Sequence, residues 1–323
     1  MKVIYASDNN YFTYVYASVK SLLSNNDNSE IEISYIQQEV SQDNIQLLKS
    51  LGKEYSNDIE IIAFQMPKQY KTLPSYGSSK TTWAKFLFAS MYPNDDRVLF
   101  LDPDTLVLGD ISKLFEVDME NNLIAGVPEC LPEYHRKASK LSDDDIYING
   151  GVVLCNLKLW RKEDFETKAL DRLSHNFQNL NYDQGVINEL CKGRVLLLPA
   201  KYNVLAEMFE LKSSKKIKQR FGFKKYYSQK EIEEAVDEPV IVHFTGFLYL
   251  KPYSIYCTHP YAKTFESIIK VSPLKFKFNE DKLNKKQIFR KWVLHNLPYG
   301  FFLFIEKIFD IRRDFLLRKT TND

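Results

Sequence analysis

The sequence predicts an α/β fold: a single Rossmann-like mixed sheet flanked by helices, followed by a helical C-terminal tail. Strand-type and helix-type segments alternate along the first hundred residues, which is typical of a sheet covered by helices. The 323 residues are 44% hydrophobic and 14% aromatic, enough for a sizeable core. No internal repeat or low-complexity segment interrupts this pattern.

The first half of the chain supplies four strands and three helices. Residues 2–6 (KVIYA) are apolar and rich in β-formers, and the polar break SDNN separates them from apolar residues at helical spacing in 11–24. Further strands are predicted at 30–36, 59–64 and 97–101. Further helices are predicted at 43–55 and 81–93, the second ended by Pro93.

The second half continues the alternation. A strand is predicted at 123–129, a strand running into a helix at 150–160, and a helix at 183–193 that ends at Gly193. The stretches 194–203 and 239–246 are expected to close the sheet, and the basic excursion 211–235 to form a loop or a small helical flap. The pattern favours a catalytic domain over 1–265 and a basic, aromatic tail over 266–323.

Cysteine usage and the N-terminus indicate a cytoplasmic protein. The four cysteines are widely spaced and form no CxxC pair, which fits neither a disulfide framework nor a zinc knuckle. The first residues lack the apolar segment of a secretory signal. No apolar stretch of about 18 residues predicts a transmembrane helix.

A pair of carboxylates follows the predicted strand 97–101. Asp102 and Asp104 flank Pro103, which cannot donate to a sheet ladder, so the strand should end there with both side chains pointing the same way beyond the sheet edge. Two such carboxylates suit Mg²⁺ or Mn²⁺, which can bridge the phosphates of a nucleotide. Taken alone, an acidic turn is the commoner explanation of this pattern.

Four further stretches provide a context for this pair. They are ASDNNY (6–11), INGGVVLCNL (148–157), YDQGVIN (182–188) and HFTG followed by KP (243–252). With the DxD pair, they resemble in order and spacing the retaining glycosyltransferase family 8, most of all its bacterial lipopolysaccharide galactosyl- and glucosyltransferases and more distantly glycogenin. The resemblance covers roughly residues 1–260. It implies a GT-A type nucleotide-sugar transferase fold.

The resemblance implies a nucleotide site at the start of the chain, formed by Ala6, Asp8, Asn10 and Tyr11. Asp8 would hydrogen-bond uracil and Tyr11 would stack on the base. Because Asp and Asn are good helix caps, a plain helix N-terminus explains the same residues, and both readings can hold together.

The resemblance also implies the metal and phosphate ligands. His243, after the apolar run VIV, would join Asp102 and Asp104 and shift the preference towards Mn²⁺. The closing loop, with Gly246 and Lys251, would reach the diphosphate and stabilise the leaving UDP. Here four residues separate Gly246 from Lys251, two more than in the family pattern.

The sugar pocket is expected to be lined by Asn149, Asp183 and Gln184, with Lys85 near the phosphates and the sugar. Simpler explanations are a turn at Asn149, a helix cap at Asp183 and an exposed lysine at Lys85. The resemblance implies transfer of glucose or galactose from UDP-glucose or UDP-galactose with retained configuration. Because Gln184 is a poor nucleophile, we expect front-face attack by the acceptor, with Asp183 binding sugar hydroxyls.

The C-terminal segment points to a membrane partner. From Lys275 to the end it holds 12 Lys/Arg against 6 Asp/Glu, interleaved with aromatic and aliphatic residues. This composition favours an amphipathic segment on an anionic membrane, although an ordinary packed helix is the alternative. The rest of the chain is net acidic and has no nucleic-acid-binding signature, so no nucleic acid is expected. A peripheral place on the inner face of the membrane follows.

Several functions remain open from the sequence. The acceptor could be lipopolysaccharide, a capsular intermediate, another glycolipid or a glycosylated protein. A nucleotide-sugar-binding protein without transferase activity is a non-enzymatic alternative, favoured by the longer loop between Gly246 and Lys251. A metal-dependent phosphatase or nucleotidyltransferase would use similar carboxylates, but it does not predict the other motifs in series.

Overall fold

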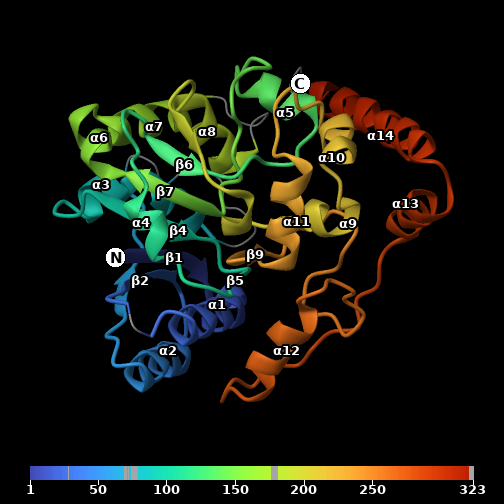
Figure 1. Cartoon of the computed structure of the whole chain (residues 1–323). Helices are drawn as coiled ribbons and strands as arrows, with labels where there is room; N and C mark the ends of the chain where they lie inside the picture. Colours follow the sequence, from blue (N-terminus) through green and yellow to red (C-terminus); the bar gives the residue numbers. More distant parts are fainter. Residues whose placement is uncertain (28, 69–70, 72, 74–78, 176–180, 320–323) are drawn as a thin grey trace.

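The computed structural model describes residues 1–323 except 28, 69–70, 72, 74–78, 176–180 and 320–323 (Figure 1). The last four residues of the predicted tail therefore lie outside the described residues, and only the backbone of residues 315–319 is described.

Seven strands form a central mixed sheet in the order β3-β2-β1-β4-β7-β6-β8, which confirms the predicted α/β architecture. Strand β1 runs parallel to β2 and β4, whereas β7 runs antiparallel to β4 and β6. The strands of this sheet are β1 (Lys2–Asp8), β2 (Glu32–Gln38), β3 (Glu60–Ala63), β4 (Arg97–Leu101), β6 (Ile124–Gly126), β7 (Val152–Asn156) and β8 (Val195–Leu197).

Helices cover both faces of the sheet (Figure 1). The helices up to residue 237 are α1 (Phe12–Ser24), α2 (Gln42–Glu54), α3 (Phe88–Met91), α4 (Ser112–Glu116), α5 (Glu133–Ala138), α6 (Leu157–Lys162), α7 (Phe165–Ser174), α8 (Tyr182–Leu190), α9 (Ala206–Leu211), α10 (Ser214–Phe221) and α11 (Gln229–Asp237). The 3₁₀ helices within the described residues include η1 (Asn9–Tyr11), η3 (Thr81–Leu87) and η4 (Ala200–Tyr202).

The central strand β1 shows why the sheet needs cover on both sides. Its side chains alternate between two hydrophobic cores, with Val3 and Tyr5 in one and Ile4 and Ala6 in the other. The first core takes in α1 and α2, and the second takes in η3, α3 and α6–α8. A strand buried on both faces reads as a continuous apolar run, which is what KVIYA is.

The structure corrects two sequence predictions and decides one alternative that the sequence left open. Residues 239–246 do not close the central sheet: β9 (Ile241–His243) pairs antiparallel with β5 (Thr105–Val107) in a separate two-stranded sheet. The basic excursion 211–235, expected to form a loop or a small helical flap, is helical over most of its length, and Ser213 and Ser228 cap α10 and α11. The helix predicted at 81–93 begins as the 3₁₀ helix η3 and becomes α-helical only at α3.

The sheet topology brings the motif segments to one edge. The chain leaves β1 towards β2 on one side and returns to β4 on the other, so a crevice opens at the carboxyl ends of β1 and β4. Because β7 is antiparallel to β4, its first residue Val152 lies opposite Leu101, and the segment before β7 lies at the same edge. The β5–β9 pair then places His243 opposite Thr105.

The C-terminal part consists of α12 (Ala262–Lys270), α13 (Lys285–Asn296) and α14 (Tyr299–Lys319). In α12, Phe265 packs on Tyr14 of α1, with ring centroids 5.4 Å apart. Helices α13 and α14 lie side by side along the flank of the molecule near α9 and α10 (Figure 1). Within the described residues, none of the helices combines the length and the apolar character that crossing a bilayer requires.

Candidate active site

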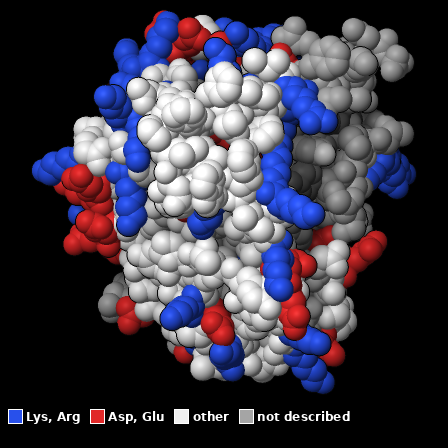
Figure 2. Space-filling view, turned by 90° about the vertical axis from the view of Figure 1, so that its right-hand side faces the viewer, with Lys and Arg blue, Asp and Glu red and all other residues white. Residues whose placement is uncertain are grey.

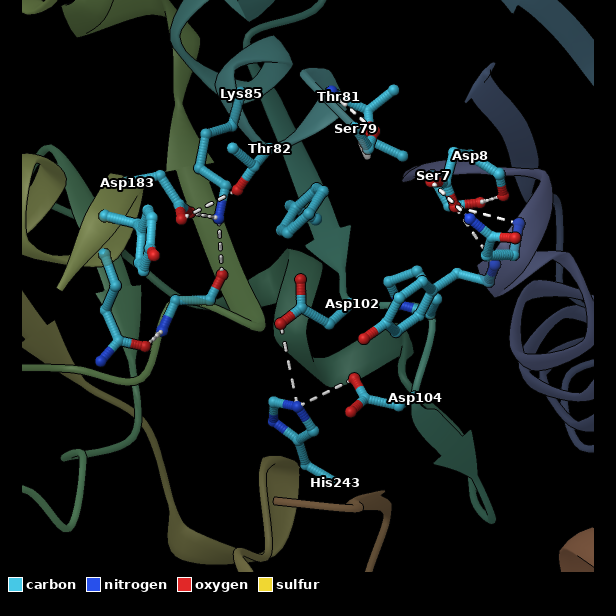
Figure 3. Close-up of a pocket in the computed structure, with 18 of the residues that line it drawn as sticks. Ser7, Asp8, Ser79, Thr81, Thr82, Lys85, Asp102, Asp104, Asp183 and His243 are labelled. Carbon is cyan, nitrogen blue, oxygen red and sulfur yellow. Dashed lines mark hydrogen bonds and ion pairs between the residues drawn. The ribbon is translucent and has the colours of Figure 1, made fainter. Parts of the chain in front are cut away.

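A cavity of about 560 Å³ opens at the carboxyl ends of β1 and β4. In Figure 3, Asp8 lies at one end, Lys85 and Asp183 lie at the other, and Asp102, Asp104 and His243 lie between them. All the predicted site residues that line this cavity come from five separate segments: Ala6, Asp8, Asn10, Tyr11, Lys85, Asp102, Asp104, Asp183, Gln184, His243 and Lys251. The structure therefore brings together residues that are up to 245 positions apart in the sequence.

The central group of the cavity consists of Asp102, Asp104 and His243. Each offers one ligand atom, and these atoms lie within 4.8 Å of one another. His243 Nε2 is 3.2 Å from Asp104 Oδ1 and 3.8 Å from Asp102 Oδ2. Strand β4 ends at Leu101, as Pro103 predicts, and the β5–β9 pair supplies the histidine. Two carboxylates with one imidazole form a donor set that suits Mn²⁺.

Gly151 makes room for these ligands. A Cβ atom at this position would lie 2.3 Å from His243 Cε1 and 2.5 Å from Asp102 Oδ2, so any other residue would push the two apart. The Gly151 carbonyl also accepts a hydrogen bond from the Asp102 amide at 2.6 Å. The donor set and this close approach together fit a divalent cation held by Asp102, Asp104 and His243.

Lys251 reaches the same group in spite of its longer loop. Its Nζ lies 2.5 Å from Asp104 Oδ2 and 2.5 Å from the Phe244 carbonyl oxygen. Phe247, with φ at 46°, turns the chain back within this loop. The two extra residues between Gly246 and Lys251 therefore leave the ammonium at the cavity.

Lys85 and Asp183 form a buried ion pair at the other end of the cavity. Lys85 Nζ lies 2.5 Å from Asp183 Oδ2, with side chains 4% and 14% exposed, and also donates to the Gly150 carbonyl at 3.0 Å. Thr82 Oγ1 donates to Asp183 Oδ1 at 3.0 Å. Thr82 and Lys85 both reach one carboxylate because residues three apart share a side of a 3₁₀ helix.

Gln184 follows Asp183 in α8 and is held through its oxygen. The Gly150 backbone N–H donates to Gln184 Oε1 at 2.7 Å. A Cβ on Gly150 would lie 3.2 Å from Gln184 Cβ, so the absence of a side chain there lets the two segments meet. The Gln184 amide nitrogen is itself buried.

The opposite end of the cavity is lined by Asp8, Asn10 and Tyr11, the residues predicted to bind a nucleotide. Asp8 is the cap of η1 and accepts from the backbone amides of Asn10 at 3.0 Å and Tyr11 at 3.3 Å. Tyr11 is 43% exposed and lines the cavity, where its ring can stack on a base. The capping role of Asp8 and the predicted nucleotide role are thus compatible.

Two predicted residues do not line the cavity. Asn149 is 4% exposed and lies beneath the metal-ligand group, where its Oδ1 is 3.1 Å from His243 Nδ1. Gly246 is exposed at the start of the loop, and a Cβ added to it would contact nothing within 4 Å. Thr82 and Tyr182 also line the cavity and were not predicted from the sequence. Their proximity to Lys85 and Asp183 in the sequence was the available signal.

The charges at the site depend on one another. Burial alone would raise the pKa of Asp104, but Lys251 and His243 outweigh it and hold that pKa well below its usual range. Burial raises the pKa of Asp102 to about 6, against the opposing effect of Lys85. Burial opposes the charge on Lys85, yet Asp183 and Asp102 raise its pKa, so the ammonium stays charged.

Comparisons with known proteins show the family of this chain. The profile of glycosyl transferase family 8 matches residues 2–254. A lipopolysaccharide 1,2-glucosyltransferase of Escherichia coli K12 is 28% identical over 282 residues, which cover 85% of this chain and 79% of that protein. A lipopolysaccharide 1,3-galactosyltransferase of Salmonella typhimurium LT2 is 26% identical over 275 residues, covering 81% of this chain and 76% of that protein.

Among solved structures, the galactosyltransferase LgtC, in complex with donor and acceptor sugar analogs, superposes with a TM-score of 0.71. The match covers 88% of this chain and 98% of that one at 21% sequence identity, which establishes the shared GT-A fold. The family profile covers most of the chain, including the segments that supply the cavity. On this basis the chain belongs to glycosyl transferase family 8.

Proposed function

We propose that this protein transfers a hexose, glucose or galactose, from a UDP-hexose to a glycan acceptor with retention of configuration, using Mn²⁺ held by Asp102, Asp104 and His243. Mg²⁺ is the alternative ion. The observation that carries this proposal is the placement of the metal-ligand group between an aromatic base site and a buried Lys85–Asp183 pair. A nucleotide, a diphosphate and a sugar can thus be bound in that order.

The diphosphate end of the donor is proposed to lie beside the metal-ligand group. A bound divalent ion supplies Lewis-acid stabilisation of the charge that develops on the departing UDP. Lys251 adds a second positive charge beside the diphosphate, since its ammonium lies 2.5 Å from Oδ2 of Asp104, one of the proposed metal ligands. Asn10 and Tyr11, at the other end of the cavity, hold the nucleoside.

Retention with a covalent intermediate needs a free nucleophile, and the described part of the cavity does not favour one. Both Asp183 oxygens are engaged, Oδ2 by Lys85 and Oδ1 by Thr82. Gln184 Oε1 accepts from the Gly150 amide and is a weak nucleophile. We therefore propose that Asp183 and Gln184 bind the sugar hydroxyls and stabilise positive charge near the ring.

In the proposed step, the acceptor hydroxyl attacks the anomeric carbon from the face that UDP leaves. The bond from that carbon to the diphosphate oxygen breaks, its electron pair leaves with UDP, and the acceptor oxygen forms the new bond. The acceptor proton passes to a diphosphate oxygen. The site contributes orientation and fixed charges rather than a covalent partner.

For the acceptor we propose a lipopolysaccharide-type glycan or another cell-surface glycolipid. The support is the similarity to the two enzymes whose names state transfer to lipopolysaccharide. A glycosylated protein is the alternative acceptor.

We propose that α13 and α14 hold the enzyme on the anionic inner face of the cytoplasmic membrane. In α14, Phe301, Phe304, Ile308 and Ile311 are spaced along one face and are between 47% and 63% exposed, and Trp292 of α13 is 53% exposed. Figure 2 looks onto this side of the molecule and shows a broad uncharged area bordered by Lys and Arg. An apolar face with basic margins suits an anionic lipid surface.

The test is UDP release from a panel of UDP-sugars with and without Mn²⁺, together with NMR of the sugar released to water in the first minutes. We expect release from UDP-glucose or UDP-galactose only when Mn²⁺ is present, with the α anomer appearing first. First appearance of the β anomer would contradict retention. Tight UDP-hexose binding without release, even with glycolipid acceptors added, would instead support a binding protein.

A further inference from the structure

The amide of Asn149 is hydrogen-bonded through both its oxygen and its nitrogen, next to the proposed metal ligands. Its Oδ1 accepts from the Gly151 amide at 2.9 Å and from Asn203 Nδ2 at 2.9 Å, and lies 3.1 Å from His243 Nδ1. Its Nδ2 donates to Glu129 Oε2. Since Asn149, Asn203, Glu129 and His243 are all at most 9% exposed, water does not compete for these bonds.

The orientation of this amide is fixed by a donor that cannot change its role. The Gly151 backbone N–H can only donate, so the side-chain atom 2.9 Å away from it must be the Asn149 oxygen. A reversed amide would place its NH₂ group against the Gly151 N–H and its oxygen against the Glu129 carboxylate. Glu129 and Gly151 therefore select one orientation from opposite ends of the amide.

This orientation determines the state of the His243 ring. An amide oxygen only accepts hydrogen bonds, so the ring nitrogen facing it, Nδ1, must carry a hydrogen. In the neutral ring the lone pair is then on Nε2, the atom that faces Asp104 Oδ1 at 3.2 Å and Asp102 Oδ2 at 3.8 Å. A hydrogen bond at one ring nitrogen commonly sets the ligand atom at the other.

We propose that Asn149 is a positioning residue for the metal site: it holds His243 as the Nδ1–H tautomer with Nε2 directed at the carboxylates, and Glu129 and Asn203 lock it in that orientation. This inference rests on the proposed function, because it concerns the metal that function requires. In this proposal the Asn-Gly-Gly segment assembles the three metal ligands: Asn149 orients the histidine, and Gly151 leaves space for it.

The direct test is the tautomer of His243 in the wild-type protein without metal. Long-range ¹H–¹⁵N NMR correlations distinguish Nδ1–H from Nε2–H rings, and a His243→Gln variant identifies the signal among the five histidines. A pH series up to about 10 ensures that the neutral ring is observed. We expect the Nδ1–H form. An Nε2–H ring would overturn the inference without any variant of Asn149.

The second test is the affinity for Mn²⁺, measured by electron paramagnetic resonance of the free ion in the presence of UDP. We expect Asn149→Ala to bind Mn²⁺ about 10–100-fold more weakly than wild type. Asn188→Ala is the matched control: Asn188 is also fully buried, but its side chain bonds to the backbone of Ile148 and Gln184 and not to His243. We expect this control to stay within about threefold of wild type.

An equal loss of Mn²⁺ affinity in Asn149→Ala and Asn188→Ala would overturn the inference, because general loosening would then explain both. Unchanged affinity in a folded Asn149→Ala would overturn it as well. If Asn149→Ala does not fold, Asn203→Ala replaces it, and we expect a smaller loss of Mn²⁺ affinity. The tautomer of His243 in the wild-type protein then decides whether the inference holds. Failure of wild type to bind Mn²⁺ would contradict the metal in the proposed function, and the tautomer would still test the role of Asn149.

Discussion

The cavity at the carboxyl ends of β1 and β4 buries charged side chains, whereas the helix pair α13–α14 exposes aromatic ones. At the cavity, Lys85 and Asp183 are only 4% and 14% exposed, and each is paired. On α14, Phe301 and Phe304 are 57% and 63% exposed. Proteins usually bury aromatic residues and expose charges, so each region departs from the norm in its own direction.

The buried charges of the cavity and the exposed aromatic residues of α14 indicate different functions for the two regions. Buried, paired charges cost desolvation free energy and are retained where an ordered electrostatic environment is needed, as in an active site. Exposed aromatics at helical spacing cost solubility and are retained where another surface covers them. Helix α14 is nevertheless fixed to the body, since Phe302 is buried and Glu306 pairs with Arg220 and Arg290. The exposed apolar side chains of α14 are therefore held in place relative to the body of the protein.

The largest expected effect on stability comes from breaking the ion pair in the cavity. Lys85→Met leaves the Asp183 carboxylate without its cation in a buried place, and we expect the free energy of unfolding to fall by roughly 3–5 kcal/mol. Adding Asp183→Asn should recover most of this loss without restoring UDP release. Denaturant unfolding of the single and double variants measures both the stability lost and the stability recovered. A double variant as unstable as the single one would show that the pair is not coupled.

A smaller change in the free energy of unfolding is expected from Glu207, a buried acid. Burial, with Glu129 nearby, raises the pKa of Glu207 from 4.5 to about 8. The folded state therefore keeps a proton that the unfolded state releases, so the free energy of unfolding should fall as pH rises from about 4.5 to about 8. Relative to Glu207→Gln, wild type should lose roughly 2–4 kcal/mol across this range. A constant difference between the two proteins from pH 5 to 8 would refute the raised pKa.

The smallest change in the free energy of unfolding is expected from substitutions in the helix pair α13–α14. Trp292→Asp with Phe304→Asp changes exposed side chains, so the free energy of unfolding should stay within about 1 kcal/mol of wild type. Binding to vesicles with anionic lipid should weaken by about tenfold or more, because two apolar anchors are lost and two negative charges are added. Vesicle flotation measures this, with neutral vesicles as the control. Undiminished flotation would place the membrane contact elsewhere.

The sequence predicted the strands of the central sheet, several helices and the place of the DxD pair at a strand end because these depend on local signals: apolar runs, caps, and a proline after β4. It did not predict the short strand β5. It did not predict that β9 leaves the central sheet, since the pairing of Thr105 with His243 spans more than a hundred residues. It also could not reveal the place of Asn149. An asparagine before two glycines looks like a turn, and only the fold brings Glu129 and His243 to its amide.

We propose that catalysis takes place in the cavity and that α13 and α14 contact the membrane. The most direct measurement is Mn²⁺-dependent UDP release, without membranes, by wild type, by Asp102→Asn with Asp104→Asn, and by Trp292→Asp with Phe304→Asp. We predict that the cavity variant loses activity by roughly 10²–10³-fold or more, and that the helix variant matches wild type. Undiminished release by the cavity variant would contradict the account.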